Sequence, residues 1–150
     1  MTIRRATESD LDAMLQLYSD TIRTVNARDY TPEQIDAWAS GGEAIRERFN
    51  EQEYFIAEIN GEIVGFSSLY PNGYLDFMYV HKDFQSRGIA TELLKTVEAR
   101  AHELLLKEIT SDVSITARPF FLKRGFEIER LYTDHYKGQE YENAKMKKTF

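Results

Sequence analysis

The chain has 150 residues, 42% of them hydrophobic and 29% charged, which is enough for one sizeable core, so we expect a single domain over residues 1–150. Nineteen basic and twenty-five acidic side chains give a net charge of -6, which repels nucleic acid and anionic lipid headgroups. The absence of cysteine excludes disulfides, a thiolate nucleophile and thiolate metal ligands. Because no targeting or membrane-spanning segment is recognisable, we expect a cytoplasmic protein without a membrane partner.

The first fifty residues predict one short strand followed by helices. A strand is expected over residues 2–6, and Thr7 and Asp10 then have the spacing of a capping box. Apolar residues recur at helical spacing to about residue 25, namely Leu11, Met14, Leu15, Tyr18, Ile22 and Val25. A second helix is expected to start at Thr31-Pro32-Glu33-Gln34 and to end at Gly41-Gly42. A third helical segment is expected over residues 43–50.

Residues 53–80 predict three antiparallel strands. The turns between them are expected at Asn60-Gly61, a strong hairpin signal, and at Pro71-Asn72-Gly73. From Ile89 the apolar pattern changes to helical period, with Leu93, Leu94, Val97, Ala101, Leu104 and Leu105 on the same face. The segment DFQSRGIATELL at 83–94 therefore contains a turn between a strand and a helix.

The last third of the chain predicts a strand at 108–113, a short helix within 116–124 that ends at Gly125, and strands at 126–132 and 141–150. The basic residues of KMKK alternate within the last strand, which indicates a solvated strand face rather than a nucleic-acid-binding tail. The three histidines lack ligand spacing, so no metal site is expected.

The turn before the long rear helix has the chemistry of an anion site. The first N–H groups of a helix have no intrahelical acceptor and carry the positive end of the helix dipole. Gly88 can adopt backbone angles closed to other residues and lets a ligand approach, Ala90 is small, and Arg87 and Gln85 can donate at the rim. Neither a Walker loop nor a three-glycine dinucleotide motif is present. The alternative is an ordinary tight turn with a solvated arginine.

The whole pattern resembles the GCN5-related N-acetyltransferases, the acyl-CoA-dependent superfamily with a Gln/Arg-x-x-Gly-x-Gly/Ala signature after a central strand. Residues 85–90 fit this signature, FMYVHKDF resembles the strand that leads into it, and ARPFFLKRGF at 117–126 resembles a second family block. NARDYTPEQIDAW at 26–38 resembles an uncharacterised bacterial subgroup. The resemblance implies an α/β (α+β) fold with a mixed central sheet of about six to seven strands, an antiparallel N-terminal meander, about four flanking helices and two central strands that splay apart.

The resemblance also implies acetyl-CoA as cosubstrate and indicates where it binds. The pantetheine arm is expected between the splayed strands and the pyrophosphate on the N–H groups of residues 86–91. The implied binding residues are Met78, Tyr79, Val80, Gln85, Ser86, Arg87, Gly88, Ile89, Ala90, Thr91 and Phe121.

Direct acetyl transfer to an amine needs an oxyanion donor, a base and a proton for the departing thiolate. The resemblance assigns the first to the backbone N–H near Met78. We take Asp76 as the candidate base, because alternation along a strand puts it on the same face as Met78. The family often has a proton-donating Tyr where this chain has Phe121, so the proton is expected from another hydroxyl (Tyr132, Tyr79, Ser114 or Thr116) or from water. Tyr132 is the candidate chosen.

The expected acceptor is a primary amine of a small molecule or peptide. Tyr18, Tyr30 and Trp38 lie in the front helices, which in this family line the acceptor side, and Asp29 and Glu33 nearby favour a cation. Two alternatives stay open: a non-catalytic acyl-CoA sensor or interaction module with the same cleft, and transfer to a hydroxyl or from a longer acyl chain. Homodimer formation is also left open.

Overall fold

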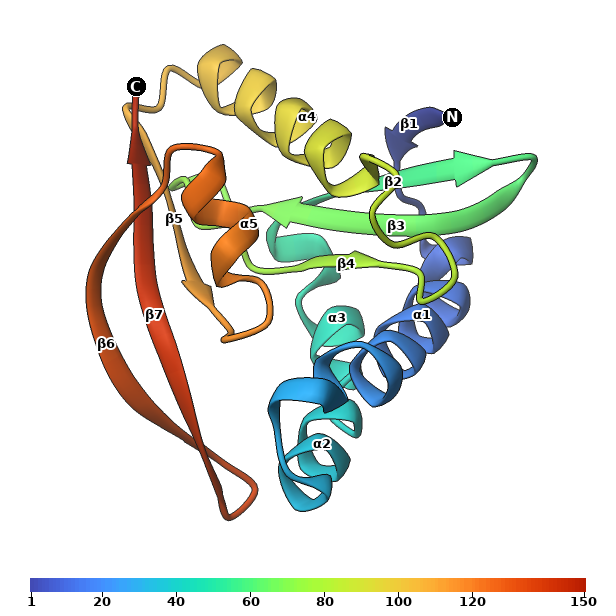
Figure 1. Cartoon of the computed structure of the whole chain (residues 1–150). Coiled ribbons are helices and arrows are strands. Elements are labelled where there is room, and N and C mark those ends of the chain that lie inside the picture. Colours follow the sequence, from blue (N-terminus) through green and yellow to red (C-terminus); the bar gives the residue numbers. More distant parts are fainter.

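The computed structural model describes all 150 residues, which form seven strands and five α-helices (Figure 1). The strands are β1 (Thr2–Arg5), β2 (Glu53–Ile59), β3 (Glu62–Leu69), β4 (Met78–Val80), β5 (Glu108–Val113), β6 (Glu127–Tyr136) and β7 (Gln139–Thr149). The helices are α1 (Leu11–Thr24), α2 (Pro32–Ala39), α3 (Glu43–Glu47), α4 (Ile89–Glu103) and α5 (Arg118–Lys123). Short 3-10 turns lie at Glu8–Asp10, Asn26–Asp29 and Phe49–Glu51.

The strands form two antiparallel sheets that meet at one point. The first has the order β1-β2-β3-β4 and the second the order β5-β7-β6. The only pairing between them is a parallel bridge between Tyr74, before β4, and Thr110 of β5. Beyond this bridge β4 and β5 diverge, as Figure 1 shows, so the two central strands are splayed as the sequence predicted.

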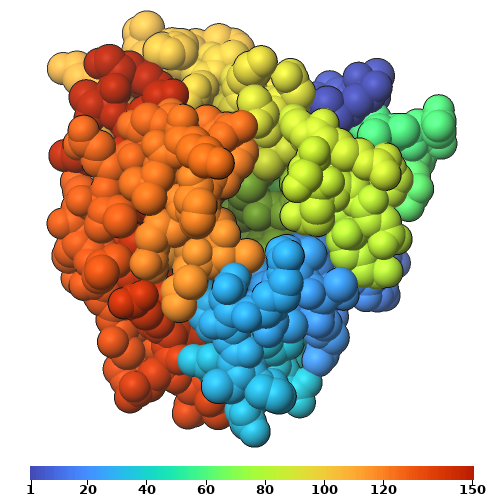
Figure 2. Space-filling view, in the orientation of Figure 1, coloured from blue at the N-terminus to red at the C-terminus, as the bar shows by residue number.

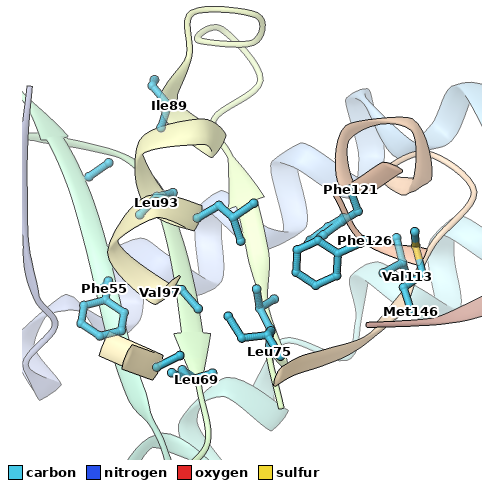
Figure 3. Close-up of a cluster of buried hydrophobic side chains, with 14 of the residues drawn as sticks. Phe55, Leu69, Leu75, Ile89, Leu93, Val97, Val113, Phe121, Phe126 and Met146 are labelled. Carbon is cyan, nitrogen blue, oxygen red and sulfur yellow. The ribbon is translucent and has the colours of Figure 1, made fainter. Parts of the chain in front are cut away.

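Two apolar clusters hold the layers together. The larger lies under α4 and joins both sheets: Ile89, Leu93 and Val97 of α4 pack with residues of the first sheet, such as Phe55 and Leu69, as Figure 3 shows. The same cluster includes Val113 and Met146 of the second sheet and Phe121 and Phe126 around α5. The smaller cluster lies on the other face of the first sheet, between β2–β4 and helices α1–α3. Burial of these side chains is the main free-energy gain that fixes the layers.

The predicted helix starts are formed by local hydrogen bonds. At α2, the Thr31 hydroxyl accepts from the N–H of Gln34 at 3.2 Å, and the Gln34 side-chain oxygen accepts from the N–H of Thr31 at 2.8 Å. This reciprocal pair and Pro32 at the first helical position satisfy donors that a helix start otherwise leaves free. A similar capping box joins Thr7 and Asp10 ahead of α1.

The predicted fold class is confirmed, with two local differences. The five α-helices lie at the five helical segments expected from the sequence and agree with the implied count of about four, since α3 and α5 are both short. The last two strands are longer than predicted and form one hairpin, with Lys137 and Gly138 both at positive φ (48° and 80°) in its turn. A Lys-Gly pair is a weaker hairpin signal than Asn-Gly, which explains why the sequence did not predict this turn.

The second difference concerns β4, which covers only residues 78–80 of the predicted strand. The N–H of Tyr70 donates to Tyr74 and the N–H of Ser68 donates to Phe77, so Leu69 alone lies opposite both Leu75 and Asp76. The extra residue makes a bulge, which interrupts the regular ladder before Met78. None of the helices combines the length and the apolar character that a bilayer crossing requires.

Candidate active site

A cleft of about 800 Å³ opens where β4 and β5 separate. Figure 2 shows the hollow between three parts of the chain: the turn before α4 (yellow-green), the segment around α5 (orange) and the front helices (blue). Its floor includes β4 and the bulge before it, and its far end reaches Tyr136 and Tyr141 of the β6–β7 hairpin. The cleft therefore joins the predicted phosphate turn to the predicted acceptor side.

The splay is fixed at its closed end by three hydrogen bonds. The N–H of Leu75 donates to Thr110 (2.8 Å), the N–H of Thr110 donates to Gly73 (3.0 Å), and the Ser111 hydroxyl donates to the carbonyl oxygen of Leu75 (2.7 Å). Along β4, Phe77 and His81 bond to β3, so the N–H groups of Met78 and Val80 between them point to the opposite side. These two N–H groups thus face the gap between the sheets.

At the mouth of the cleft, the turn before α4 presents a row of free N–H groups. None of the N–H groups of residues 86–91 donates to an acceptor in the protein; the first to do so is that of Glu92, which bonds to the carbonyl oxygen of Gly88 at 3.1 Å. Ser86 and Gly88 both have positive φ (60° and 81°), and no atom lies within 4 Å of a Cβ placed on Gly88. Such a run of N–H groups at a helix start is suited to a diphosphate.

The predicted rim residues have different roles in the turn. The Gln85 amide donates to the carbonyl oxygen of Val80 at 2.7 Å, so this side chain fixes the turn to β4 rather than pointing a free donor at a ligand. The guanidinium carbon of Arg87 lies 5.0 Å from the centre of the Phe84 ring. Ile89 is buried in the larger core, where it anchors the first turn of α4, while Ala90 and Thr91 line the cleft.

Arg124 is a cleft residue that the sequence analysis missed. Its guanidinium donates to the Thr91 hydroxyl at 2.6 Å and lies 4.3 Å from the centre of the Phe120 ring. This places a second cation beside the free N–H groups of the turn. The sequence shows only a basic residue near the end of a short helix, and nothing in its spacing reveals that α5 packs next to the start of α4.

Asp76 lies in the bulge before β4, and its carboxylate is 7% exposed. It accepts from Arg48 at 3.2 Å on both oxygens and from Gln52 at 2.9 Å. Because of the extra residue in the bulge, Asp76 faces the side of the sheet that carries α1–α3, whereas Met78 packs against the cluster under α4. The expectation that Asp76 and Met78 share a strand face is therefore wrong, although both line the cleft.

Phe121 is 2% exposed and packs edge to face against Phe120 and Phe126. Phe121 has no hydroxyl, and most of the other hydroxyls considered as proton donors already form hydrogen bonds within the protein. Tyr132 donates to Asp112 at 2.8 Å, and burial together with this bond raises the pKa of Tyr132 to about 12. Burial also raises the pKa of Tyr79, whose hydroxyl contacts the Trp38 side chain.

The two smaller hydroxyls lie near the start of α5. Thr116 donates to Asp29 at 2.8 Å, and Ser114 accepts from the N–H of Ala117 at 3.2 Å. Both residues line the cleft, as do Tyr79 and Tyr132. The candidates for proton donation therefore lie around one cavity, although they come from three separate parts of the chain.

The acceptor end of the cleft is lined by aromatic rings. Tyr30, Trp38 and Tyr141 pack edge to face or tilted, with ring centres 5.2–6.1 Å apart. Tyr18 donates to the carbonyl oxygen of Trp38 at 3.0 Å. The predicted aromatic residues thus lie together in the cleft wall.

The carboxylates of the cleft wall differ from those predicted. They are Asp76, Asp112 and Asp134, rather than Asp29 and Glu33. Asp112 accepts from both Tyr74 (2.7 Å) and Tyr132 (2.8 Å) and forms no ion pair within the protein. This end of the cleft is therefore electronegative, apart from Arg48.

Comparison with known proteins defines the family. The profile of the acetyltransferase (GNAT) domain family matches residues 26–149. Over 146 residues the chain is 30% identical to an uncharacterised N-acetyltransferase, YafP, of Escherichia coli K12, covering 97% of this chain and 93% of that protein. The chain belongs to the GNAT acetyltransferases, and the acyltransferase class predicted from its sequence is confirmed.

Solved structures agree with this assignment. A GCN5-related N-acetyltransferase from Rhodopseudomonas palustris superposes with a TM-score of 0.94 at 30% identity, over 99% of this chain and 95% of that one. The PaiA N-acetyltransferase of Thermoplasma acidophilum, solved in complex with coenzyme A, has the same fold, with a TM-score of 0.77 at 20% identity over 99% and 98% of the two chains.

Proposed function

We propose that the protein transfers the acetyl group of acetyl-CoA directly to a primary amine of a small molecule or peptide. The observation that carries this proposal is the row of six free N–H groups at residues 86–91, at the mouth of the cleft between the splayed strands. A diphosphate satisfies these donors, and Arg87 and Arg124 add positive charge beside it. The pantetheine arm then runs along β4, where the N–H groups of Met78 and Val80 face the gap.

When bound, acetyl-CoA supplies a thioester whose carbonyl carbon forms a bond to the amine nitrogen as its bond to sulfur breaks. The N–H of Met78 donates to the carbonyl oxygen as that oxygen gains charge, a contribution worth about 3 kcal/mol in other acyl-transfer enzymes. Asp76, at the bulge, takes the proton that the ammonium must lose, directly or through water. The departing thiolate takes a proton from Tyr132, another cleft hydroxyl or water.

The charges of the cleft wall support a cationic acceptor. Asp112 and Asp134 form no ion pair within the protein, so both can interact with a protonated amine, whereas Asp76 is already neutralised by Arg48. Tyr30, Trp38 and Tyr141 add ring faces, which also attract cations. We therefore place the amine between the aromatic wall and the carboxylates.

The substitution Gly88→Glu tests the site of the diphosphate. The new carboxylate lies among the free N–H groups, and we expect affinity for acetyl-CoA and CoA to fall by at least about a hundredfold, since the charge both occupies the donors and repels phosphate. Isothermal titration calorimetry measures this affinity. For the parent protein, acetyl-CoA at a hundred times its dissociation constant is expected to add about 2.7 kcal/mol to the free energy of unfolding.

Gly61→Glu is the matched control. Gly61 lies in the β2–β3 turn with nearly the same φ (78°), and it too has nothing within 4 Å of an added Cβ. Both variants therefore carry the same left-handed backbone strain and the same added charge. If the Gly88→Glu variant and this control bind CoA with equal affinity, the diphosphate does not bind at this turn.

A further inference from the structure

One hydroxyl of the cleft wall accepts a backbone hydrogen bond while its own proton stays unbonded. The phenolic oxygen of Tyr30 accepts from the N–H of Ile115 at 2.8 Å, and the side chain of Ser114 also interacts with it. No group of the protein accepts the proton of this hydroxyl. Because Tyr30 is half-buried and lines the cleft, its proton is available to a molecule bound there.

The other tyrosines of the cleft wall are bonded or placed differently. Four of them already donate their protons to oxygen atoms of the protein, namely Tyr18, Tyr74, Tyr132 and Tyr141. Tyr79 packs on the side of β4 that faces α1–α3, where burial raises its pKa. Tyr136, at the end of β6, lies at the far end of the cleft and is 38% exposed. Tyr30 is therefore the tyrosine of the cleft that is best suited to donate a proton.

The splay of the central strands sets the position of Tyr30 relative to the reacting atoms. The two strands are last paired at Tyr74 and Thr110 and run parallel from there. Counted from that bridge, Met78 lies four residues further along one strand and Ser114 four residues further along the other. The Tyr30 hydroxyl, which is held beside Ser114, therefore lies across the gap from the N–H of Met78. The thioester lies at that N–H in the proposed function.

On the basis of the proposed function, we propose that Tyr30 is the acid that protonates the thiolate of CoA, a step for which Phe121 has no hydroxyl. As the bond between the carbonyl carbon and sulfur breaks, the O–H bond of Tyr30 breaks too, and its proton forms the S–H bond of the departing thiol. The phenolate left on Tyr30 is stabilised by the hydrogen bond from Ile115 and takes up a proton from water after CoA leaves.

The charges around Tyr30 support this role. Burial raises the pKa of its phenol and Asp29 adds to the rise, whereas the N–H of Ile115 and the charge of Arg118 act in the opposite direction. The Arg118 side chain is only 17% exposed, and its Nε and Nη2 atoms have no hydrogen-bond partner, while Nη1 donates to Glu142 at 3.4 Å. A cation so little exposed to water stabilises a neighbouring phenolate, which brings the acidity of the phenol closer to that of a thiol.

Titration of the thiol of bound CoA tests the assignment without an acceptor amine. CoA labelled with an NMR-active isotope at the carbon bonded to sulfur reports the pKa of the thiol through the chemical shift of that carbon. We expect Tyr30→Phe to raise this pKa by at least about one unit, because the thiolate loses a hydrogen bond to its charged form. Release of thiol from acetyl-CoA in the presence of amines is expected to fall about a hundredfold.

A second variant separates proton donation from packing. A fluorinated tyrosine at position 30 keeps the hydrogen bond from Ile115 and is a more acidic phenol, so it is expected to lower the pKa of the bound thiol. Tyr70→Phe is the control, because it removes a tyrosine hydroxyl that lies outside the cleft and donates to Glu51. It is expected to leave the pKa of the thiol at the parent value.

The possible results separate this assignment from the proposed function. Tyr30 is not the proton donor if Tyr30→Phe and Tyr70→Phe give the same thiol pKa, or if the fluorinated tyrosine leaves that pKa unchanged. A rise of the thiol pKa in Tyr132→Phe, with none in Tyr30→Phe, assigns the proton to Tyr132 and overturns the proposal. In each of these cases CoA still binds and the proposed function stands, whereas a parent protein that does not bind CoA contradicts both.

Discussion

Asp76 is both a candidate base and the buried partner of an ion pair with Arg48, whose side chain is 47% exposed. Its carboxylate accepts hydrogen bonds from Arg48 and Gln52 and is nearly inaccessible to solvent. Hydrogen bonds from two separate residues hold this carboxylate in a fixed position. Substitution at this residue therefore has to separate catalysis from stability.

Asp76→Asn keeps the size of the side chain and removes its basicity. We expect turnover at neutral pH to fall by about a hundredfold, the lower end of the range for a general base, and the rise of turnover with pH to flatten. Initial rates of thiol release between pH 5 and 9 measure both. In a protein that keeps the parent rate and pH profile, Asp76 has only a structural role.

Arg48→Gln provides the comparison for that experiment. It removes the ion pair and leaves the carboxylate bound to Gln52, so it lowers the free energy of unfolding without removing the base. The two variants are therefore expected to have similar losses of thermal stability and different pH profiles.

At the scale of elements, the start of the chain is fixed by one charged junction. Asp10, which precedes α1, is 8% exposed and accepts hydrogen bonds from Arg4 of β1 at 2.8 and 2.9 Å and from the N–H of Thr7 at 2.8 Å. The hydrogen bond from Arg4 is the main reason that the pKa of Asp10 falls from 3.8 to about 2. The carboxylate thereby joins the first strand to the first helix.

This junction predicts a dependence of stability on pH. The pKa of Asp10 is lower in the folded protein than in the unfolded chain. Its contribution to the free energy of unfolding is therefore fully present above pH 4 and is lost as the pH falls through about 2. Arg4 is 40% exposed, so we expect about 1 kcal/mol rather than the full value of the shift. Urea titrations of the parent and of Asp10→Asn at pH 2 to 6 measure this contribution. The difference in free energy of unfolding between the two proteins is expected to decrease as the pH is lowered. Asp12→Asn, at a carboxylate that is 96% exposed, is the control.

The elements that the sequence predicted well are those with a strong local signal. The Thr31 and Thr7 capping boxes, the Asn60-Gly61 turn and the apolar stripe of α4 as far as Ala101 each determine structure within a few residues. The stripe was predicted too long, because α4 ends at Glu103 and Leu105 is 88% exposed. The bulge at Asp76 carries no such signal, because alternation is the only rule available for a strand and it gives the wrong face after an inserted residue. Arg124 was missed for a related reason, since its position depends on how two distant helices pack.

At the scale of the whole molecule, the cleft separates two sheets that are nevertheless joined in three ways. One is the bridge at Tyr74 and Thr110, and another is the apolar cluster under α4, which contains residues of both sheets. The third is at the far end, where Tyr141 donates to the carbonyl oxygen of Gln34 at 2.7 Å and the Gln34 side chain donates to Glu140 at 2.6 Å. The cleft is thus closed at both ends by contacts within the protein.

We propose from these contacts that residues 1–150 form a single domain and unfold as one unit. Separating the sheets exposes the cluster under α4, which is the only buried cluster that contains residues of the second sheet, so that sheet is left without a core. In urea, far-UV circular dichroism, which reports on all elements, and the fluorescence of Trp38, which reports on the front helices, are therefore expected to change at the same midpoint. Bound acetyl-CoA is expected to raise both midpoints equally, since it contacts both sides of the cleft. Two separate midpoints, or a shift of only one of them, would mean that the sheets are independent units and that the splayed strands belong to a boundary between domains.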